Sequence, residues 1–153
     1  MRADDAAVPP VRPLFLQPAV LALVLVGGAV GTAARALLAD AFPVHDGTWP
    51  WATFGVNVSG SFLLGVLVAL VSTREGGSGR WRLVRPALGA GVLGGFTTYS
   101  TFAVEVDRLL DGGSLGLGLG YAGASVVLGV LAAALGVLLG GGIGAPRSAE
   151  VSS

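Results

Sequence analysis

The chain lacks several residue types on which other protein classes depend. It has no cysteine, no lysine and one histidine, and charged residues make up only 12% of its 153 residues. Without cysteine there is neither a disulfide nor a thiolate metal site, and His45 alone cannot build a metal cluster. The zero net charge gives no sign of a nucleic-acid partner, and no nucleophile–base pair indicates an enzyme. A soluble domain carries about 25% charged residues, so the composition argues against a soluble protein.

Long uncharged stretches take the place of the missing charge. A helix needs about 20 apolar residues to cross a bilayer, and runs such as LLGVLVALV lack the alternation of a barrel strand. We therefore predict an all-α membrane protein with an N-terminal cytoplasmic segment over 1–17 and a flexible C-terminal tail over 142–153. The transmembrane domain between them, 18–141, is predicted to hold four helices, near 18–39, 50–72, 86–107 and 115–141.

The arginines are distributed unevenly around these four predicted helices. Four crossings place both termini and the second connection on one side, with seven of the nine arginines, and leave Arg35 and Arg108 on the other. Because the arginine-rich side is normally cytoplasmic, both termini are predicted to be cytoplasmic. Basic residues that are all arginine, together with abundant alanine and glycine, hint at a GC-rich bacterial genome, and we therefore expect a bacterial plasma membrane.

Glycine is abundant, with 26 residues, and many glycines are spaced four apart. In lipid, helices associate through close backbone approach rather than through the hydrophobic effect, and this spacing permits it. We expect a tightly packed bundle that forms oligomers. The pairs are Gly27 and Gly31, Gly91 and Gly95, Gly116 and Gly120, and Gly136 and Gly140.

Polar residues follow helical spacing inside the second and fourth predicted helices. Thr53, Asn57 and Ser61 are four residues apart and share one face, and Tyr121 and Ser125 do the same. Buried polar groups are unfavourable without a partner. A hydrogen bond between helices is one explanation for them, and a polar pathway is the other.

The third predicted helix contains the strongest signal, VLGGFTTYSTF. Gly94 and Gly95 predict a break in this helix, followed by five hydroxyl residues. Irregular backbone at membrane depth is tolerated when it is buried in protein or lines a cavity. No Asp, Glu, Lys or His lies near the middle of a predicted helix. Hydroxyls, an amide and aromatic ring edges suit a small anion, and free carbonyls at a break suit a small cation.

Three stretches resemble the signatures of one family. GGAVGTAAR at 27–35, ATFGVNVSGSFLLG at 52–65 and GVLGGFTTYSTF at 91–102 resemble, in order and spacing, those of the CrcB/Fluc fluoride channels. The resemblance covers about residues 20–140. It implies an antiparallel dimer of the dual-topology type, with two narrow pores along the subunit interface.

The resemblance also assigns roles to individual residues. It implies a central structural Na⁺ held by the backbone carbonyls of Gly94 and Thr97, and a vestibule role for Arg35 in attracting anions. The residues that the resemblance places on the anion pathway are Asn57, Tyr99, Phe102, Thr53, Ser100, Thr101, Tyr121 and Ser125.

The predicted function is passive, fluoride-selective export of cytoplasmic fluoride across the plasma membrane, which lowers fluoride toxicity. Two positions depart from the family pattern: Tyr99 replaces the usual phenylalanine, and Ala52 replaces the usual glycine. Because of Tyr99, a heterodimeric channel in which only part of the pore is active remains an alternative. The uneven arginine distribution favours pairing with a homologous subunit of opposite orientation. A small multidrug-type exporter is another four-helix alternative, but such exporters use a membrane-embedded glutamate, which 18–39 lacks.

Overall fold

The computed structural model describes residues 17–72 and 81–144, and every regular element in these residues is helical. The predicted all-α fold is confirmed. Nearly all of the predicted N-terminal segment and residues 145–153 of the predicted tail lie outside the described residues. Within the described residues, three helices are long and apolar enough to cross a bilayer, namely α1 (Pro18–Ala41), α2 (Trp51–Ser72) and α6 (Leu115–Gly144).

The third predicted helix is divided into shorter segments. Pro86 has no amide hydrogen, and glycine at 89 weakens an α-helix. The backbone here takes the wider π-helical turn, in which the N–H of Gly94 reaches the carbonyl of Gly89. The segments are α3 (Trp81–Val84), the π-helix η2 (Arg85–Leu93), α4 (Gly94–Phe96) and α5 (Tyr99–Asp111).

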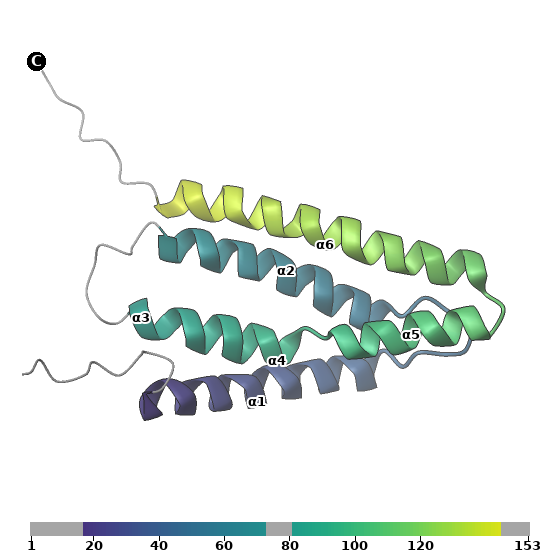
Figure 1. The fold of residues 1–153 in the computed structure, drawn as a ribbon, viewed down its shortest axis with the longest axis horizontal. Coiled ribbons are helices and arrows are strands. Elements are labelled where there is room, and N and C mark those ends of the chain that lie inside the picture. Colours follow the sequence, from purple (N-terminus) through teal and green to yellow (C-terminus); the bar gives the residue numbers. More distant parts are fainter. Residues whose placement is uncertain (1–16, 73–80, 145–153) are drawn as a thin grey trace, which may run out of the picture.

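The helices run along one another as an elongated bundle (Figure 1). α2 packs along α6, η2 and α4 pack along α1, and α5 packs against α6. The start of α1 and the end of α6 lie at the same end of the bundle, and the connections α1–α2 and α5–α6 lie at the other end. Gly113, with φ of 78°, allows the tight turn between α5 and α6.

Close backbone approach joins the helices in pairs. A Cβ on Gly136 of α6 would overlap the carbonyl oxygen of Phe62 on α2, and a Cβ on Gly31 of α1 would overlap that of Val92 on η2. These positions accept glycine alone at the present helix separation. The predicted small-residue packing is therefore present in two places, between α2 and α6 and between α1 and η2.

One face of α6 has no helix packed on it. A Cβ on Gly116, Gly120 or Gly123 would meet no atom of the described residues within 4 Å. Only 6% of the residues in the most apolar window of α6 are buried. This face of the bundle is open to lipid or to another chain.

Candidate functional site

The helix interruption lies at Thr97 and Thr98, where both residues are extended, with φ/ψ of −78°/158° and −148°/125°. The predicted position at Gly94 and Gly95 is wrong, because both glycines are helical. Gly95 is needed for packing, since a Cβ there would overlap the carbonyl oxygen of Gly28. The extended backbone falls on two β-branched threonines instead, which favour it over helix.

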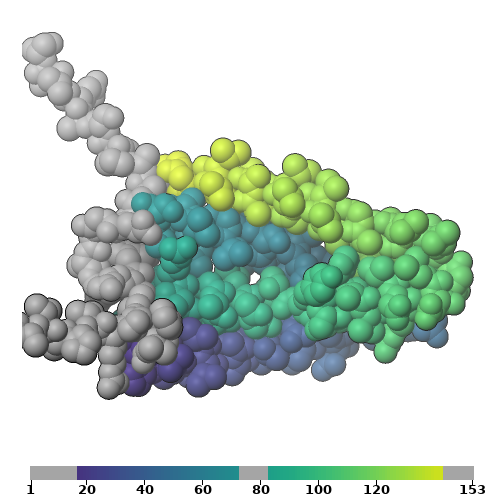
Figure 2. All heavy atoms as spheres, in the orientation of Figure 1, coloured from purple at the N-terminus to yellow at the C-terminus, as the bar shows by residue number. Residues whose placement is uncertain are grey.

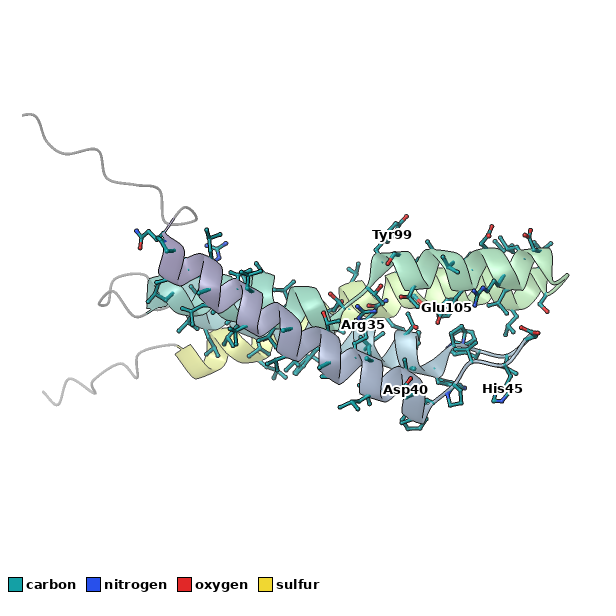
Figure 3. The ribbon with its side chains drawn as sticks, turned by 90° about the horizontal axis from the view of Figure 1, so that it is seen from below. Arg35, Asp40, His45, Tyr99 and Glu105 are labelled. Carbon is teal, nitrogen blue, oxygen red and sulfur yellow. The ribbon has the colours of Figure 1, made fainter. Side chains whose placement is uncertain are left out.

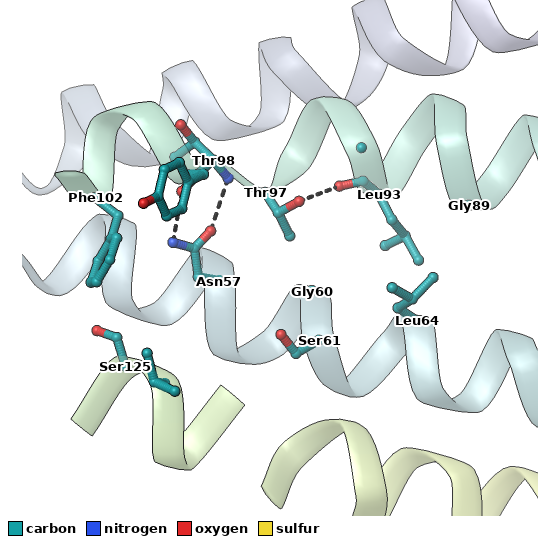
Figure 4. A pocket seen from close by; sticks show the side chains of 13 residues that line it. Asn57, Gly60, Ser61, Leu64, Gly89, Leu93, Thr97, Thr98, Phe102 and Ser125 are labelled. Atoms are coloured by element: carbon teal, nitrogen blue, oxygen red, sulfur yellow. Dashed lines mark hydrogen bonds between the residues drawn. The ribbon is translucent and has the colours of Figure 1, made fainter. Parts of the chain in front are cut away.

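Asn57 on α2 holds one side of the interruption (Figure 4). Its Nδ2 donates to the carbonyl of Thr98 at 2.9 Å, and its Oδ1 accepts from the N–H of Thr98 at 2.9 Å. A side-chain amide carries two N–H donors. The second N–H of Asn57 therefore remains available to a ligand.

Most of the hydroxyls after Phe96 bond within their own segment. Thr97 Oγ1 donates to the carbonyl of Leu93 at 2.9 Å, as threonine often does four residues back along a helix. Thr98 caps α5 by accepting from the N–H of Thr101 at 3.2 Å, and its Oγ1 also lies 3.0 Å from that of Thr101. The Thr98 hydroxyl thus satisfies the N–H of Thr101 at the start of α5. The Thr97 hydroxyl joins the backbone N–H of Thr97 on the carbonyl of Leu93.

A cavity of about 390 Å³ lies beside the interruption, and Figure 2 shows the molecule hollowed between α2 and the third segment of the bundle. Four predicted pathway residues line this cavity: Asn57, Tyr99, Phe102 and Ser125. The Oγ of Ser125 is buried and has no hydrogen-bond partner among the described residues. No charged side chain of the described residues lines the cavity. It is therefore a neutral site with at least one unused hydroxyl.

A second cavity, of about 830 Å³, opens toward the end of the bundle that carries the α1–α2 and α5–α6 connections. The predicted pathway residues Ser100 and Thr101 line it, together with Glu105 and Arg108. The structure thus places six of the eight predicted pathway residues in two cavities on either side of the first turns of α5. The other two, Thr53 and Tyr121, line neither cavity and bond to Glu105.

Glu105 is the residue of this region that the sequence analysis did not select. It is only 8% exposed, and it accepts hydrogen bonds from Thr53 Oγ1 at 2.7 Å and from the hydroxyl of Tyr121 at 2.8 Å. Glu105 follows Thr101 by four residues and Phe102 by three, so it lies on the face of α5 that carries these two predicted pathway residues. This spacing was the feature of the sequence that could have indicated it. Glu105 lies near the end of the predicted helix 86–107, so the absence of charge near the middle of that helix gave no reason to select it.

Aromatic rings form a continuous row from the interruption to the end of the bundle. The ring centroids are 6.1 Å apart for Tyr99 and Phe102, 5.4 Å for Phe102 and Tyr121, and 5.4 Å for Tyr121 and Trp49. Tyr121 is fully buried, whereas Tyr99 is 81% exposed and points away from its own chain (Figure 3). The positive ring edges of this row can attract an anion.

Arg35 contacts the interruption from α1. Its Nε donates to the carbonyl of Gly95 at 3.2 Å, and Thr32 Oγ1 contacts the same oxygen at 3.4 Å. Arg35 is not among the lining residues of the two cavities described above. Its predicted vestibule role stays a prediction.

The carbonyls of Gly94 and Thr97 have different surroundings from that of Gly95. The N–H that would bond to Gly94 in a continuous helix belongs to Thr98 and bonds to Asn57 instead. Within residues 17–72 and 81–144, neither Gly94 nor Thr97 has a hydrogen bond to its carbonyl. Uncharged carbonyl oxygens of this kind suit a small monovalent cation.

Comparison with known proteins identifies the family. A model of the family described as CrcB-like protein, Camphor Resistance (CrcB), matches residues 22–137. The chain is 46% identical over 135 residues to the fluoride-specific ion channel FluC 2 of Leifsonia xyli subsp. xyli. The aligned residues make up 88% of this chain and 92% of that protein.

Two further relatives carry similar names. Identity is 44% over 140 residues to the fluoride-specific ion channel FluC 2 of Nocardia farcinica, covering 90% of this chain and 89% of that protein. It is 42% over 125 residues to the fluoride-specific ion channel FluC of Novosphingobium aromaticivorans, covering 80% and 96%. The resemblance seen in the sequence is therefore confirmed, and the chain belongs to the CrcB family.

Proposed function

We propose that this chain is a subunit of a passive, fluoride-selective channel that lets cytoplasmic fluoride leave the cell. The names of its relatives support the fluoride channel function. The observation that carries the proposal is the uncharged cavity, where the second N–H of Asn57 and the unpartnered hydroxyl of Ser125 lie near the rings of Phe102 and Tyr99. A negative cell interior drives an anion outward by about 2.3 kcal/mol per charge per 100 mV.

Neutral donors explain how such a cavity selects fluoride. Fluoride is small and strongly hydrated, so an apolar pore would admit the more easily dehydrated chloride instead. Donors placed around a narrow path replace the lost water, as carbonyls do for cations in potassium channels. Asn57 and Ser125 supply an N–H and an O–H without a carboxylate that would repel the ion.

Glu105 limits which hydroxyls are free to serve an anion. A hydroxyl carries one proton, and those of Thr53 and Tyr121 are donated to this carboxylate. An anion that reaches either hydroxyl must compete with Glu105 for the same proton. Thr53 and Tyr121 therefore belong to the pathway only in a state where this carboxylate has turned away from them.

A structural Na⁺ fits the donor set at the interruption. The carbonyl oxygens of Gly94 and Thr97 would hold it, because no amide of the described residues bonds to them and both residues line the cavity. When bound, the ion supplies a fixed positive charge near the anion route. Asn57 keeps the carbonyl of Gly94 free by accepting the N–H of Thr98.

A second subunit in the opposite orientation completes the proposed channel. Tyr99 is 81% exposed, and the α6 face at Gly116, Gly120 and Gly123 has no neighbour within the described residues. Small residues allow a helix of another chain to approach closely. Seven arginines on one predicted side of the membrane and two on the other favour one fixed orientation for this chain. We therefore propose that its partner is a homologue with the opposite arginine distribution rather than a second copy.

The proposal is tested by fluoride efflux from liposomes, with this chain alone and together with a homologous subunit from the same genome. We expect rapid efflux of fluoride and none of chloride with the homologue present. The absence of fluoride efflux in both preparations would contradict the channel function. A functional antiparallel dimer formed by this chain alone would contradict only the paired homologue.

A further inference from the structure

The bundle segment that runs from η2 to α5 is interrupted at a point where hydrogen bonds from neighbouring helices replace its own. In a continuous α-helix the N–H of Thr98 would donate to the carbonyl of Gly94. It donates instead to Oδ1 of Asn57 on α2, at 2.9 Å. One bond that would close the interruption is thus prevented on the donor side.

The next bond is prevented on the acceptor side. The carbonyl of Gly95 would accept from the N–H of Tyr99 in a continuous helix, but among the described residues it accepts from Arg35 and Thr32 on α1, at 3.2 and 3.4 Å. Thr32 and Arg35, both on α1, therefore take the place of the N–H of Tyr99 at the carbonyl of Gly95.

Close packing brings Arg35 to this carbonyl. A Cβ on Gly95 would overlap the carbonyl oxygen of Gly28, so α1 and α4 touch backbone to backbone. Arg35 lies one turn after Gly31, another glycine of the same contact. Figure 3 shows its side chain between α1 and the interrupted segment.

The charge of the guanidinium suits this position. The carbonyls at the end of a helix carry partial negative charge, and a cation near them is stabilising. Hydrogen bonds that involve a charged group are stronger than those between neutral groups. Arginine keeps its charge when partly buried, whereas lysine can lose it.

We propose that Arg35 is a positioning residue that holds the interruption open by donating to the carbonyl of Gly95. Asn57 holds the interruption open as well, by accepting from the N–H of Thr98. The role of Arg35 in conduction rests on the proposed function, but its role in the geometry does not. Without the guanidinium, the N–H of Tyr99 can bond to Gly95, and α4 and α5 join into a more continuous helix. The first turn of α5, which carries the pathway residues of both cavities, then moves.

Spin labels test the geometry directly, because the chain has no cysteine of its own. Leu88 on η2 and Val104 on α5 are 45% and 48% exposed and lie on opposite sides of the interruption. Each is replaced by cysteine and labelled, and labelled subunits are diluted into unlabelled ones before the distance distribution is measured by pulsed electron resonance. Fluoride efflux is measured on the same proteins.

Arg35→Met removes the donor and the charge but keeps the length of the side chain. We expect its distance distribution to shift or become bimodal, with the ratio of open to joined helix falling about tenfold, as loss of a charge-assisted hydrogen bond predicts. Arg35→Lys should give a smaller shift. The control Asp40→Asn, at an exposed charged residue of the same helix that lines neither cavity, should match the wild type.

Each result decides the proposal. An unchanged distribution in both Arg35 variants overturns it, even where the melting temperature falls, because loss of stability alone does not move the labels. If Arg35→Met gives no folded protein, the shift in Arg35→Lys decides alone. A shifted distribution in Arg35→Met, combined with a wild-type protein that conducts no fluoride with or without the homologous subunit, would support the geometry and contradict the proposed function.

Discussion

The bundle has two closely packed seams that serve different purposes. Between α2 and α6, glycines such as Gly136 bring the backbones together, and Gly136 meets backbone atoms of Phe62 and Val66. Between α1 and α4, Gly28 does the same, but Arg35 and Thr32 on the same helix bond to a carbonyl of the interruption. Close backbone approach thus packs the helices together in both places, but between α1 and α4 it also brings hydrogen-bond donors to the interruption.

The largest expected effects are losses of stability on replacing a packed glycine by alanine, and they distinguish the two helix contacts. Gly136→Ala and Gly31→Ala both force a methyl group into a backbone carbonyl, and each should destabilise the protein by about 1–3 kcal/mol. Melting temperature in detergent measures this. We expect only Gly31→Ala to lower fluoride efflux per folded protein as well, because only its seam holds the interruption.

Gly141→Ala on α6 is the matched control, since a Cβ there meets nothing within 4 Å. It should leave stability unchanged or raise it by about 0.5–1 kcal/mol, as alanine does in a helix. Equal melting temperatures for Gly136→Ala and Gly141→Ala would show that the α2–α6 seam is looser than described.

A comparable effect on stability is expected at the buried carboxylate. Tyr121→Phe removes one of the two hydroxyls that bond to Glu105 and leaves a buried oxygen without a partner, which should destabilise the protein by about 1–3 kcal/mol. Adding Glu105→Leu to this variant should restore part of the loss. A double variant less stable than Tyr121→Phe alone would contradict the role given to the pair.

Loss of the unpartnered hydroxyl should affect conduction more than stability. We expect Ser125→Ala to reduce fluoride efflux roughly three- to tenfold, the effect of about one hydrogen bond. Ser59→Ala is the matched control, because that hydroxyl bonds to the carbonyl of Gly55 on its own helix. The same loss in both variants would remove Ser125 from the pathway.

The smallest effect is predicted for the residue that departs from the family pattern. Tyr99→Phe keeps the ring, and no hydrogen bond to the Tyr99 hydroxyl is present among the described residues, so efflux should change by less than about twofold. An efflux that rises well beyond this range would favour the alternative in which the tyrosine marks a pore that is only partly active.

The sequence predicted the helical class because uncharged length and backbone satisfaction in lipid are local properties. It misplaced the interruption because glycine at 94 and 95 indicates weak helix, whereas the interruption depends on Asn57, about 40 positions earlier, taking the N–H of Thr98. Glu105 was passed over for a related reason. Its burial depends on Thr53 and Tyr121, which belong to other helices.

The most direct test of the central claim, that fluoride passes through a neutral cavity beside Asn57, is fluoride efflux from liposomes containing Asn57→Asp. A carboxylate at this position places a fixed negative charge beside the ion and loses the donor N–H. We predict that efflux is abolished while the protein remains folded. Undiminished efflux in the folded variant would contradict the account.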